Sequence, residues 1–177
     1  MAKKRDGKRT ESSSGIWDII RLSRRKEVPI AKQRQTFRAW SGKVPFSTYG
    51  RKPVVKVGGK PLFAELAVLR LLKRDGWDGV WVDRTKFRKA VREQAAAVPL
   101  RKSAARFLQR IRDSIGKSKG GCWDVFAWKK GRYLFVECKR QNRDRMRRSQ
   151  KDWLAAALKL GVPATWFRVV EWDILGT

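Results

Sequence analysis

The chain contains no histidine and only two cysteines, Cys122 and Cys138, among its 177 residues. Without histidine, the Ser-His and Cys-His nucleophile pairs are excluded, and so is acid–base chemistry based on an imidazole. The cysteines form no Cys-x-x-Cys motif, which argues against structural zinc and against a disulfide framework. Any hydrolysis would therefore depend on a bound metal or on carboxylate and lysine side chains.

Long apolar runs are also absent. No segment approaches the roughly 18 consecutive apolar residues needed to cross a bilayer, and the basic residues 1–6 do not lead into an apolar signal region. We expect a soluble intracellular protein with no signal peptide and no membrane partner, located in the cytoplasm or associated with the nucleoid.

Acidic residues are scarce, with 16 Asp and Glu against 44 Lys and Arg, and the formal net charge is +28. Self-repulsion of this size is usually relieved by a polyanion, of which nucleic acid is the commonest. A membrane surface is the weaker alternative. The length of the chain allows one compact domain and a tail.

The first 60 residues are basic and interrupted by Gly, Ser and Pro. This composition predicts a basic N-terminal arm over residues 1–60, disordered over residues 1–15 and weakly structured beyond them, with one short amphipathic segment at residues 16–22. A solvated tail without a specific role is the alternative. Residues 61–177 are predicted to form the folded domain.

Periodicity within this domain predicts alternating helices and strands, and Pro61 suits the first turn of its first helix. Two of the helices form a helical insertion, residues 85–118. The expected helices are residues 61–74, 86–97, 100–115 and 150–160, and the expected strands are residues 77–83 and 164–172.

A hairpin is predicted over residues 123–139. With Lys130 and Gly131 as a two-residue turn, the register places Asp124 directly opposite Glu137. Side chains in such a pair lie about 5 Å apart, and like charges there destabilise the sheet unless something neutralises them. The alternative without a functional role is a pair of solvent-exposed acids whose charges are neutralised by nearby arginines.

A divalent cation is the simplest neutraliser of this pair, because Mg²⁺ binds one or two protein carboxylates and completes its shell with water and phosphate oxygens. Lys139 follows Glu137 by two residues, so both side chains belong to the same face of the sheet. The sequence thus predicts two carboxylates, a metal and an ammonium group at one place.

These motifs together resemble the VRR-NUC branch of the PD-(D/E)XK nucleases. The resemblance rests on a helix bearing Glu65, on Asp124, on Glu137–Lys139 and on Gln150–Trp153, and it covers about residues 61–172. It implies an α/β fold, a restriction-endonuclease-like α/β/α sandwich with a central mixed sheet, in which the helical insertion precedes the catalytic hairpin.

The resemblance also implies a role for each residue of the motif. Asp124 and Glu137 would hold Mg²⁺ or Mn²⁺ together with the backbone carbonyl of Cys138. Lys139 would orient or activate the attacking water, and Gln150 would brace that water or the lysine. The sequence departs from the family at Trp123, where a proline is usual before the aspartate.

Glu65 corresponds to the glutamate that the family carries on its first helix, and it belongs to the predicted catalytic set. Two of these positions also have an explanation without a catalytic role. Glu65 would only neutralise the charge of Arg70 or Lys73 on the same helix, and Gln150 would be an ordinary residue at the start of a helix. The thiol of Cys138 is expected to be a small buried group without reactivity.

The resemblance implies a metal-dependent DNA endonuclease, acting as a homodimer on branched or structured DNA in repair or recombination. A non-catalytic nucleic-acid-binding or packaging protein is the rival, since the net charge alone would suffice for it. An RNA-directed nuclease is a third reading. The cations predicted to contact phosphate are Arg140, Arg143, Arg145, Arg147, Arg148, Lys151, Arg106 and Arg110.

Overall fold

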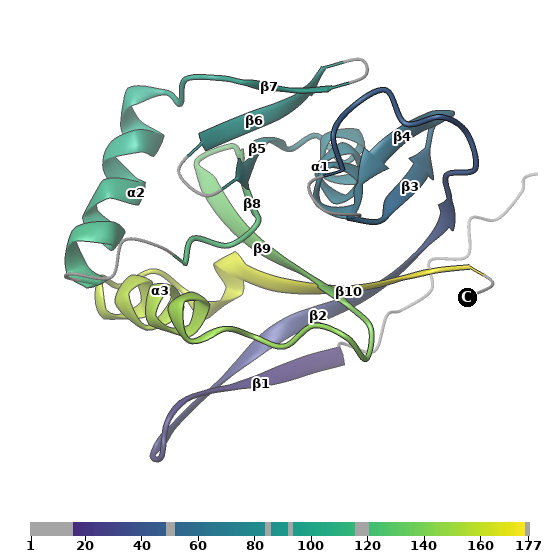
Figure 1. Ribbon diagram of the computed structural model, residues 1–177. Helices are drawn as coiled ribbons and strands as arrows, with labels where there is room; N and C mark the ends of the chain where they lie inside the picture. Colours follow the sequence, from purple (N-terminus) through teal and green to yellow (C-terminus); the bar gives the residue numbers. More distant parts are fainter. Residues whose placement is uncertain (1–15, 49–51, 84–85, 92–93, 116–120, 176–177) are drawn as a thin grey trace, which may run out of the picture.

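The computed structural model describes residues 16–48, 52–83, 86–91, 94–115 and 121–175, and it shows a mixed α/β fold (Figure 1). The helices are α1 (Ala64–Arg74), α2 (Lys102–Ile115), α3 (Arg148–Lys159) and the short 3-10 helix η1 (Ala164–Trp166). The strands are β1 (Ile16–Ser23), β2 (Lys26–Ala39), β3 (Val54–Val57), β4 (Lys60–Phe63), β5 (Asp78–Asp83), β6 (Lys86–Val91), β7 (Gln94–Ala97), β8 (Val125–Lys129), β9 (Arg132–Arg140) and β10 (Phe167–Ile174).

All ten strands belong to one sheet, in the order β4-β3-β2-β10-β9-β8-β5-β6-β7, with β1 paired to β2. Strand β10 is parallel to both of its neighbours, β2 and β9, while the other pairs are antiparallel. The sheet is therefore mixed, as predicted.

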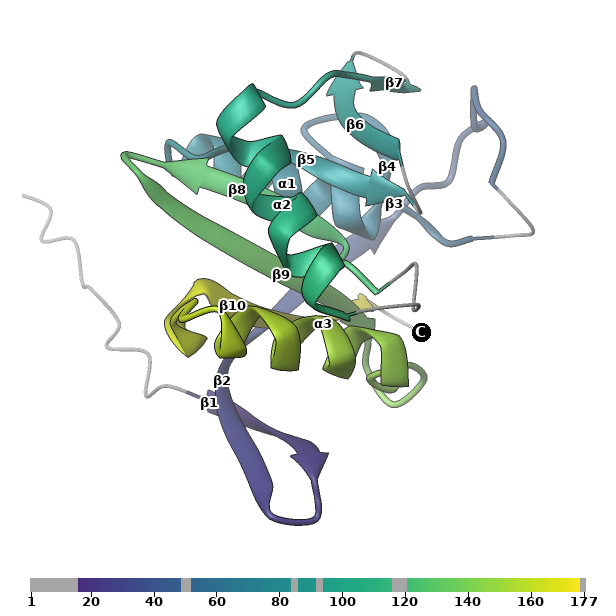
Figure 2. The same cartoon turned by 90° about the vertical axis from the view of Figure 1, so that its left-hand side faces the viewer.

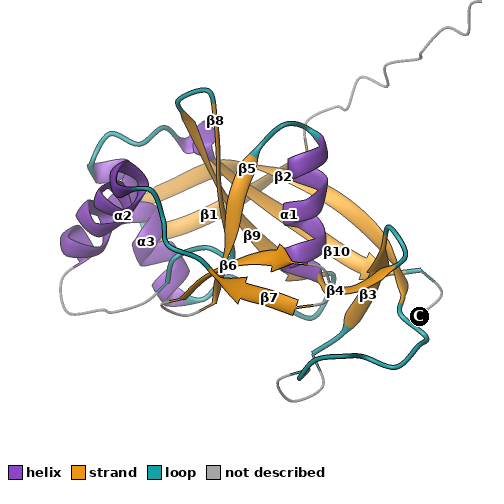
Figure 3. Cartoon of the chain, turned by 90° about the horizontal axis from the view of Figure 1, so that it is seen from above, coloured by secondary structure: helices purple, strands orange, loops and turns teal. Residues whose placement is uncertain are grey.

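The helices cover the two faces of the sheet, as Figures 1 and 3 show. Helix α1 packs on one face, where Leu69 and Leu72 contact a cluster that includes Val136 of β9. Helices α2 and α3 pack on the other face, where Ile111 and Leu154 belong to a second cluster with the aromatic residues of β8 and β9. This arrangement confirms the predicted α/β/α sandwich.

The hairpin of β8 and β9 has the predicted register. Lys129 pairs with Arg132, and Val125, the first residue of β8, pairs with Val136. The same register continued by one residue sets Asp124 opposite Glu137. The turn residues Lys130 and Gly131 have φ angles of 47° and 78°, the left-handed values that a two-residue turn of type I′ requires.

The N-terminal region differs from the predicted arm. Residues 1–15 lie outside the described residues, but residues 16–39 form the β1–β2 hairpin, and β2 pairs along β10 within the main sheet. The weakly structured arm expected there was wrong, because its composition gives no sign of the free edge of β10, which is distant in sequence. The location of a domain boundary stays a prediction.

The helix predicted at residues 86–97 was also wrong. Its residues form β6 and β7, which extend the sheet from the edge of β5, so tertiary pairing overrides the helical propensity of an alanine-rich segment. Pro61 likewise lies in β4, and α1 begins only after Phe63. The helix expected at residues 100–115 is confirmed as α2.

The three α-helices are all too short or too polar to span a bilayer, so the described part of the chain offers no membrane-crossing helix.

Candidate active site

Asp124 and Glu137 are brought together at the end of the β8–β9 hairpin. Asp124 immediately precedes β8; its backbone oxygen accepts a hydrogen bond from Val82 of β5 (2.7 Å), and its Oδ2 accepts one from the backbone N–H of Cys138 (2.9 Å). Glu137 lies within β9 and is only 1% exposed. The charge of Glu137 is close enough to Asp124 to raise the pKa of its carboxyl group.

Glu137 is held by a lysine and a glutamine through the same oxygen. The Nζ of Lys139 lies 2.8 Å from Glu137 Oε1, and the side-chain amide of Gln150 donates to that oxygen at 2.6 Å. Gln150 Oε1 in turn accepts from Lys139 Nζ (3.1 Å) and from the backbone N–H of Arg147 (2.8 Å). These four contacts fix the positions of Glu137 and Lys139 relative to the start of α3.

The environment favours the protonated forms of both acids. Desolvation raises the pKa of Asp124 well above its usual value, and the negative charges of Glu137 and Glu65 raise it further. Desolvation also raises the pKa of Glu137, although the ammonium group of Lys139 opposes this effect. A site that concentrates carboxylates in this way stabilises a bound cation.

The structure bears on whether a divalent metal fits here. Glu137 Oε2 is buried and has no hydrogen-bond partner in the described structure, and the same is true of Glu65 Oε2. Among the described residues, no three Cys, Asp or Glu side chains lie close enough to form a metal site by themselves. Two carboxylates and one carbonyl suit a hard cation that keeps several waters, so the residues fit Mg²⁺ or Mn²⁺.

Cys138 presents its backbone rather than its thiol. The side chain is 6% exposed and packs on the α1 side of the sheet, and burial raises the pKa of the thiol well above its ordinary value. A protonated, buried thiol is a poor nucleophile and a poor ligand. This agrees with the interpretation of Cys138 as a small buried residue.

Glu65 lies on α1 and lines the same cleft, but its partner is neither Arg70 nor Lys73. Lys52 Nζ lies 2.6 Å from Glu65 Oε1 and 5.2 Å from the ring centroids of both Phe63 and Trp81. Sequence analysis missed Lys52, because the segment before β3 was assigned to a weakly structured arm. The only signal for it is its place among basic residues, which does not distinguish one lysine from another.

All of these groups open into one cleft of about 520 Å³. The acids and the two lysines line this cleft together with Arg143, Arg145 and Arg147 of the loop before α3. Asp83 and Asp144 also line the cleft, and the sequence analysis gave neither of them a role. Cations beside paired carboxylates provide both a place for a metal and contacts for a phosphate backbone.

The remaining predicted phosphate contacts are not gathered at the cleft. Arg140 is partly buried against Trp172, with its guanidinium carbon 5.7 Å from the ring centroid, and Arg148 pairs with Asp152. Arg106 and Arg110 are exposed on α2 and do not line the cleft. Lys151 lines a neighbouring groove.

Trp123 and Gly121, which both precede β8, hold the start of α3 close to the two acids. The indole N–H of Trp123, which stands where the family usually has proline, donates to the backbone oxygen of Gln150 (3.2 Å). Gly121, at φ +98°, passes so close to Ser149 that a Cβ there would lie 2.0 Å from its backbone oxygen. The close approach explains why glycine occupies this position.

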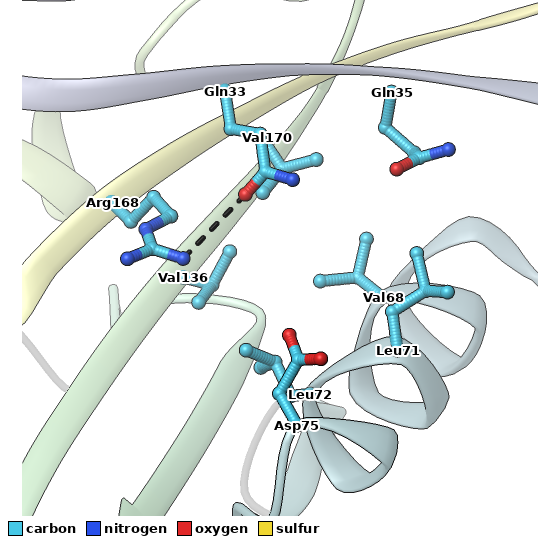
Figure 4. Close-up of a pocket in the computed structure, with 9 residues that line it drawn as sticks. All are labelled: Gln33, Gln35, Val68, Leu71, Leu72, Asp75, Val136, Arg168 and Val170. Carbon is cyan, nitrogen blue, oxygen red and sulfur yellow. Dashed lines mark hydrogen bonds between the residues drawn. The ribbon is translucent and has the colours of Figure 1, made fainter. Parts of the chain in front are cut away.

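A second cavity lies between α1 and the sheet, and Figure 4 shows its lining. It has a volume of about 40 Å³, and Arg168 there donates to Gln33 at 3.5 Å. None of the predicted site residues lines it. The larger cleft is therefore the candidate active site.

The sandwich fold, the paired carboxylates and the neighbouring lysine define a protein of the PD-(D/E)XK nuclease class. The model of the VRR-NUC domain matches residues 67–171. The chain belongs to the VRR-NUC family, and a nuclease-type function follows from this membership. No curated protein matches the chain.

Proposed function

We propose that this chain is a metal-dependent endonuclease that hydrolyses phosphodiester bonds in DNA. The observation that carries the proposal is the cluster of Asp124, Glu137, Lys139 and Gln150, in which a buried carboxylate oxygen of Glu137 has no hydrogen-bond partner among the described residues. The cleft around this cluster is lined by arginines, which are the side chains best suited to contact phosphate.

The metal ligands in this proposal are the carboxylates of Asp124 and Glu137 and the backbone carbonyl of Cys138. Bound Mg²⁺ or Mn²⁺ supplies Lewis acidity at the phosphate and lowers the pKa of water. The backbone N–H of Cys138 and the amide of Gln150 hold the two carboxylates in place. Because this scaffold exists before substrate binds, little reorganisation is needed during the reaction.

Lys139 is the residue that would act on the phosphate in this proposal. Two of its three N–H bonds are directed to Glu137 and Gln150 within the described structure, which leaves a third for a phosphate oxygen or the attacking water. Its positive charge would stabilise the negative charge that develops on the phosphate. Arg143, Arg145 and Arg147 would hold the flanking backbone.

The test is nicking of supercoiled DNA with Mg²⁺. We expect Asp124→Asn and Lys139→Ala each to lower the rate on the order of a hundredfold or more, as removal of a group that stabilises a transition state does. The matched control is Asp113→Asn, which removes one exposed acid from α2 and should retain the wild-type rate. Equal rates in all four proteins would contradict the proposal.

The same assay distinguishes the alternatives. A non-catalytic binding or packaging protein would bind DNA with or without Asp124, and an RNA-directed nuclease would cut matched RNA in preference to DNA. The family resemblance further predicts a homodimer, a preference for branched DNA and a role in repair or recombination. A substrate panel of flap, junction and linear duplex, with sedimentation of the free protein, tests these predictions.

A further inference from the structure

The β1–β2 hairpin carries unpaired positive charge at its free end. Ser23 pairs with Lys26 across the turn residues Arg24 and Arg25, and all four are exposed. Within the described structure, no acidic side chain pairs with either turn arginine or with Lys26, because the nearby Glu27 is bound to another arginine of the hairpin. Figures 1 and 2 show that the hairpin extends past α3, away from the rest of the molecule.

A groove of about 260 Å³ lies at the base of this hairpin. One side is formed by hairpin residues, among them Arg21 and Lys32, and the other by the loop before α3 and by Lys151. Lys139, Asp144 and Arg145 line both this groove and the catalytic cleft, so two of the three shared residues are cations. The two hollows are therefore neighbours that share a basic wall, and one nucleic-acid strand can occupy both.

The basic side chains of the groove are more available to a ligand than its acidic side chains. Three acids line the groove against five Lys and Arg side chains. Glu171 pairs with Lys32 at 2.9 Å and with Arg34 at 3.3 Å, Asp144 accepts a backbone hydrogen bond in the loop, and Asp18 is half-buried on β1. In contrast, Arg145 and Lys151 form no ion pair with the described residues. A phosphate in the groove would thus meet cations whose charges are not already neutralised.

The sheet register gives the offset, measured along β2, between the row of Glu137 and the hairpin tip. Glu137 pairs with Val169, and Val169 pairs with Lys32, so these residues lie in one row across three strands. Lys26 precedes Lys32 by six residues of β2, or about 20 Å at about 3.3 Å per residue. This span corresponds to about six base pairs of duplex at about 3.4 Å each.

We propose that the β1–β2 hairpin is a second DNA-binding element, which holds the DNA backbone along this groove and at its basic tip while the scissile phosphate lies in the cleft. The inference rests on the proposed function and deepens it, because the hairpin precedes the residues that match the family model. It assigns to this part of the chain the task of positioning duplex beside the site of cleavage.

The test compares two hairpin turns in the full chain. Arg24→Gln with Arg25→Gln removes two cations from the tip, and Lys130→Gln with Arg132→Gln removes two exposed cations from the β8–β9 turn. By the register, this turn lies as many residues from Glu137 along its strand as the tip lies from Lys32, but it does not line the groove. Binding of a fluorescein-labelled linear DNA duplex is measured by anisotropy over a range of salt concentrations, with EDTA present to prevent cleavage.

We expect the tip variant to reduce the slope of log K against log salt by about 1.8, which is two phosphate contacts at about 0.9 each, and the control variant to leave it unchanged. Hydroxyl-radical footprints should also be shorter for the tip variant. Equal slopes for the two variants would overturn the inference, because they would indicate only general charge attraction.

A second outcome would overturn it as well. Trp17 and Ile19 of β1 are 56% and 55% exposed, and such apolar side chains could instead join two copies of the chain. In that case Trp17→Ser would reduce self-association in sedimentation and leave the affinity for DNA unchanged. Failure of the hairpin contact is distinguishable from failure of the proposed function, because the latter is decided by nicking in Asp124→Asn. Circular dichroism verifies that each turn variant folds.

Discussion

At the scale of single residues, the candidate site depends on how one glutamate is partnered. Glu137 Oε1 accepts hydrogen bonds from both Lys139 and Gln150, whereas Oε2 is buried and has no partner in the part of the chain that the structure describes. A buried carboxylate in this state costs folding free energy unless a cation satisfies it. Its presence is therefore better explained by function than by stability.

Gln150 should contribute to stability as well as to activity. We expect Gln150→Leu to lower the free energy of unfolding by about 1–3 kcal/mol, because Glu137 loses a buried hydrogen-bond donor. Urea denaturation without divalent metal measures this change. The control is Gln109→Leu on α2, where an exposed glutamine bonds to Asp113; a loss as large as that of Gln150→Leu would contradict the explanation.

At the scale of elements, Glu171 of β10 joins β10 to β2. Its carboxylate lies between Lys32 and Arg34 of β2, and the hydrogen bond and charge of Lys32, with a smaller effect from Arg34, hold its pKa below the usual value. A depressed pKa stabilises the fold above the pKa of the unfolded state, about 4.3 for glutamate. This stabilisation is lost as the pH falls through the lower, folded value.

Glu171→Gln should accordingly destabilise the protein at neutral pH but have little effect at strongly acidic pH. We expect the free energy of unfolding at neutral pH to fall by about 1 kcal/mol. Denaturation at several pH values measures it. Glu27→Gln on β2, the strand that carries Lys32 and Arg34, serves as the control, since Glu27 is 48% exposed in its pair with Arg21 and such surface pairs contribute little. A loss that does not depend on pH would refute this account.

At the scale of the whole molecule, folding brings acids together in a chain that has few of them. The pKa of Asp124 is raised by desolvation and by its acidic neighbours. A raised pKa means that the folded state binds more protons, so stability decreases as pH rises from the unfolded pKa through the folded one. Without metal at neutral pH, the charged form of Asp124 therefore destabilises the folded state.

Asp124→Asn should stabilise the metal-free protein at neutral pH while abolishing activity. We expect a gain on the order of 1 kcal/mol in EDTA, because the substitution removes a buried charge that has no bound cation. Added Mg²⁺ should raise the melting temperature of the wild type more than that of the variant, since ligands stabilise the state that binds them. Calorimetry tests both effects; a lower stability of Asp124→Asn than of the control Asp113→Asn would contradict this expectation.

Much of the candidate site follows from local features of the sequence. The turn residues Lys130 and Gly131 set the hairpin register, which places Asp124 opposite Glu137, and the period of a strand places Lys139 on the same face. The helix that supplies Gln150 was predicted to within two residues of its observed start. Each of these features depends on a few neighbouring residues.

Other parts of the site depend on contacts between segments that are distant in the chain. Lys52 meets Glu65 because β3 and β4 return the chain to α1, and Lys32 reaches the row of Glu137 because β2 pairs with β10. The alanine-rich segment forms β6 and β7 because the edge of β5 accepts a strand there. Composition and periodicity do not encode such pairings.

The sequence by itself determined the pair of acids, the neighbouring lysine and the family, because turn chemistry and strand period act over short distances along the chain. Only the tertiary structure decided that the N-terminal segment is part of the sheet, that its lysines lie beside the site, and that its hairpin extends the basic surface. The physical reason is that a free strand edge binds whichever segment the fold brings to it, irrespective of its position in the sequence.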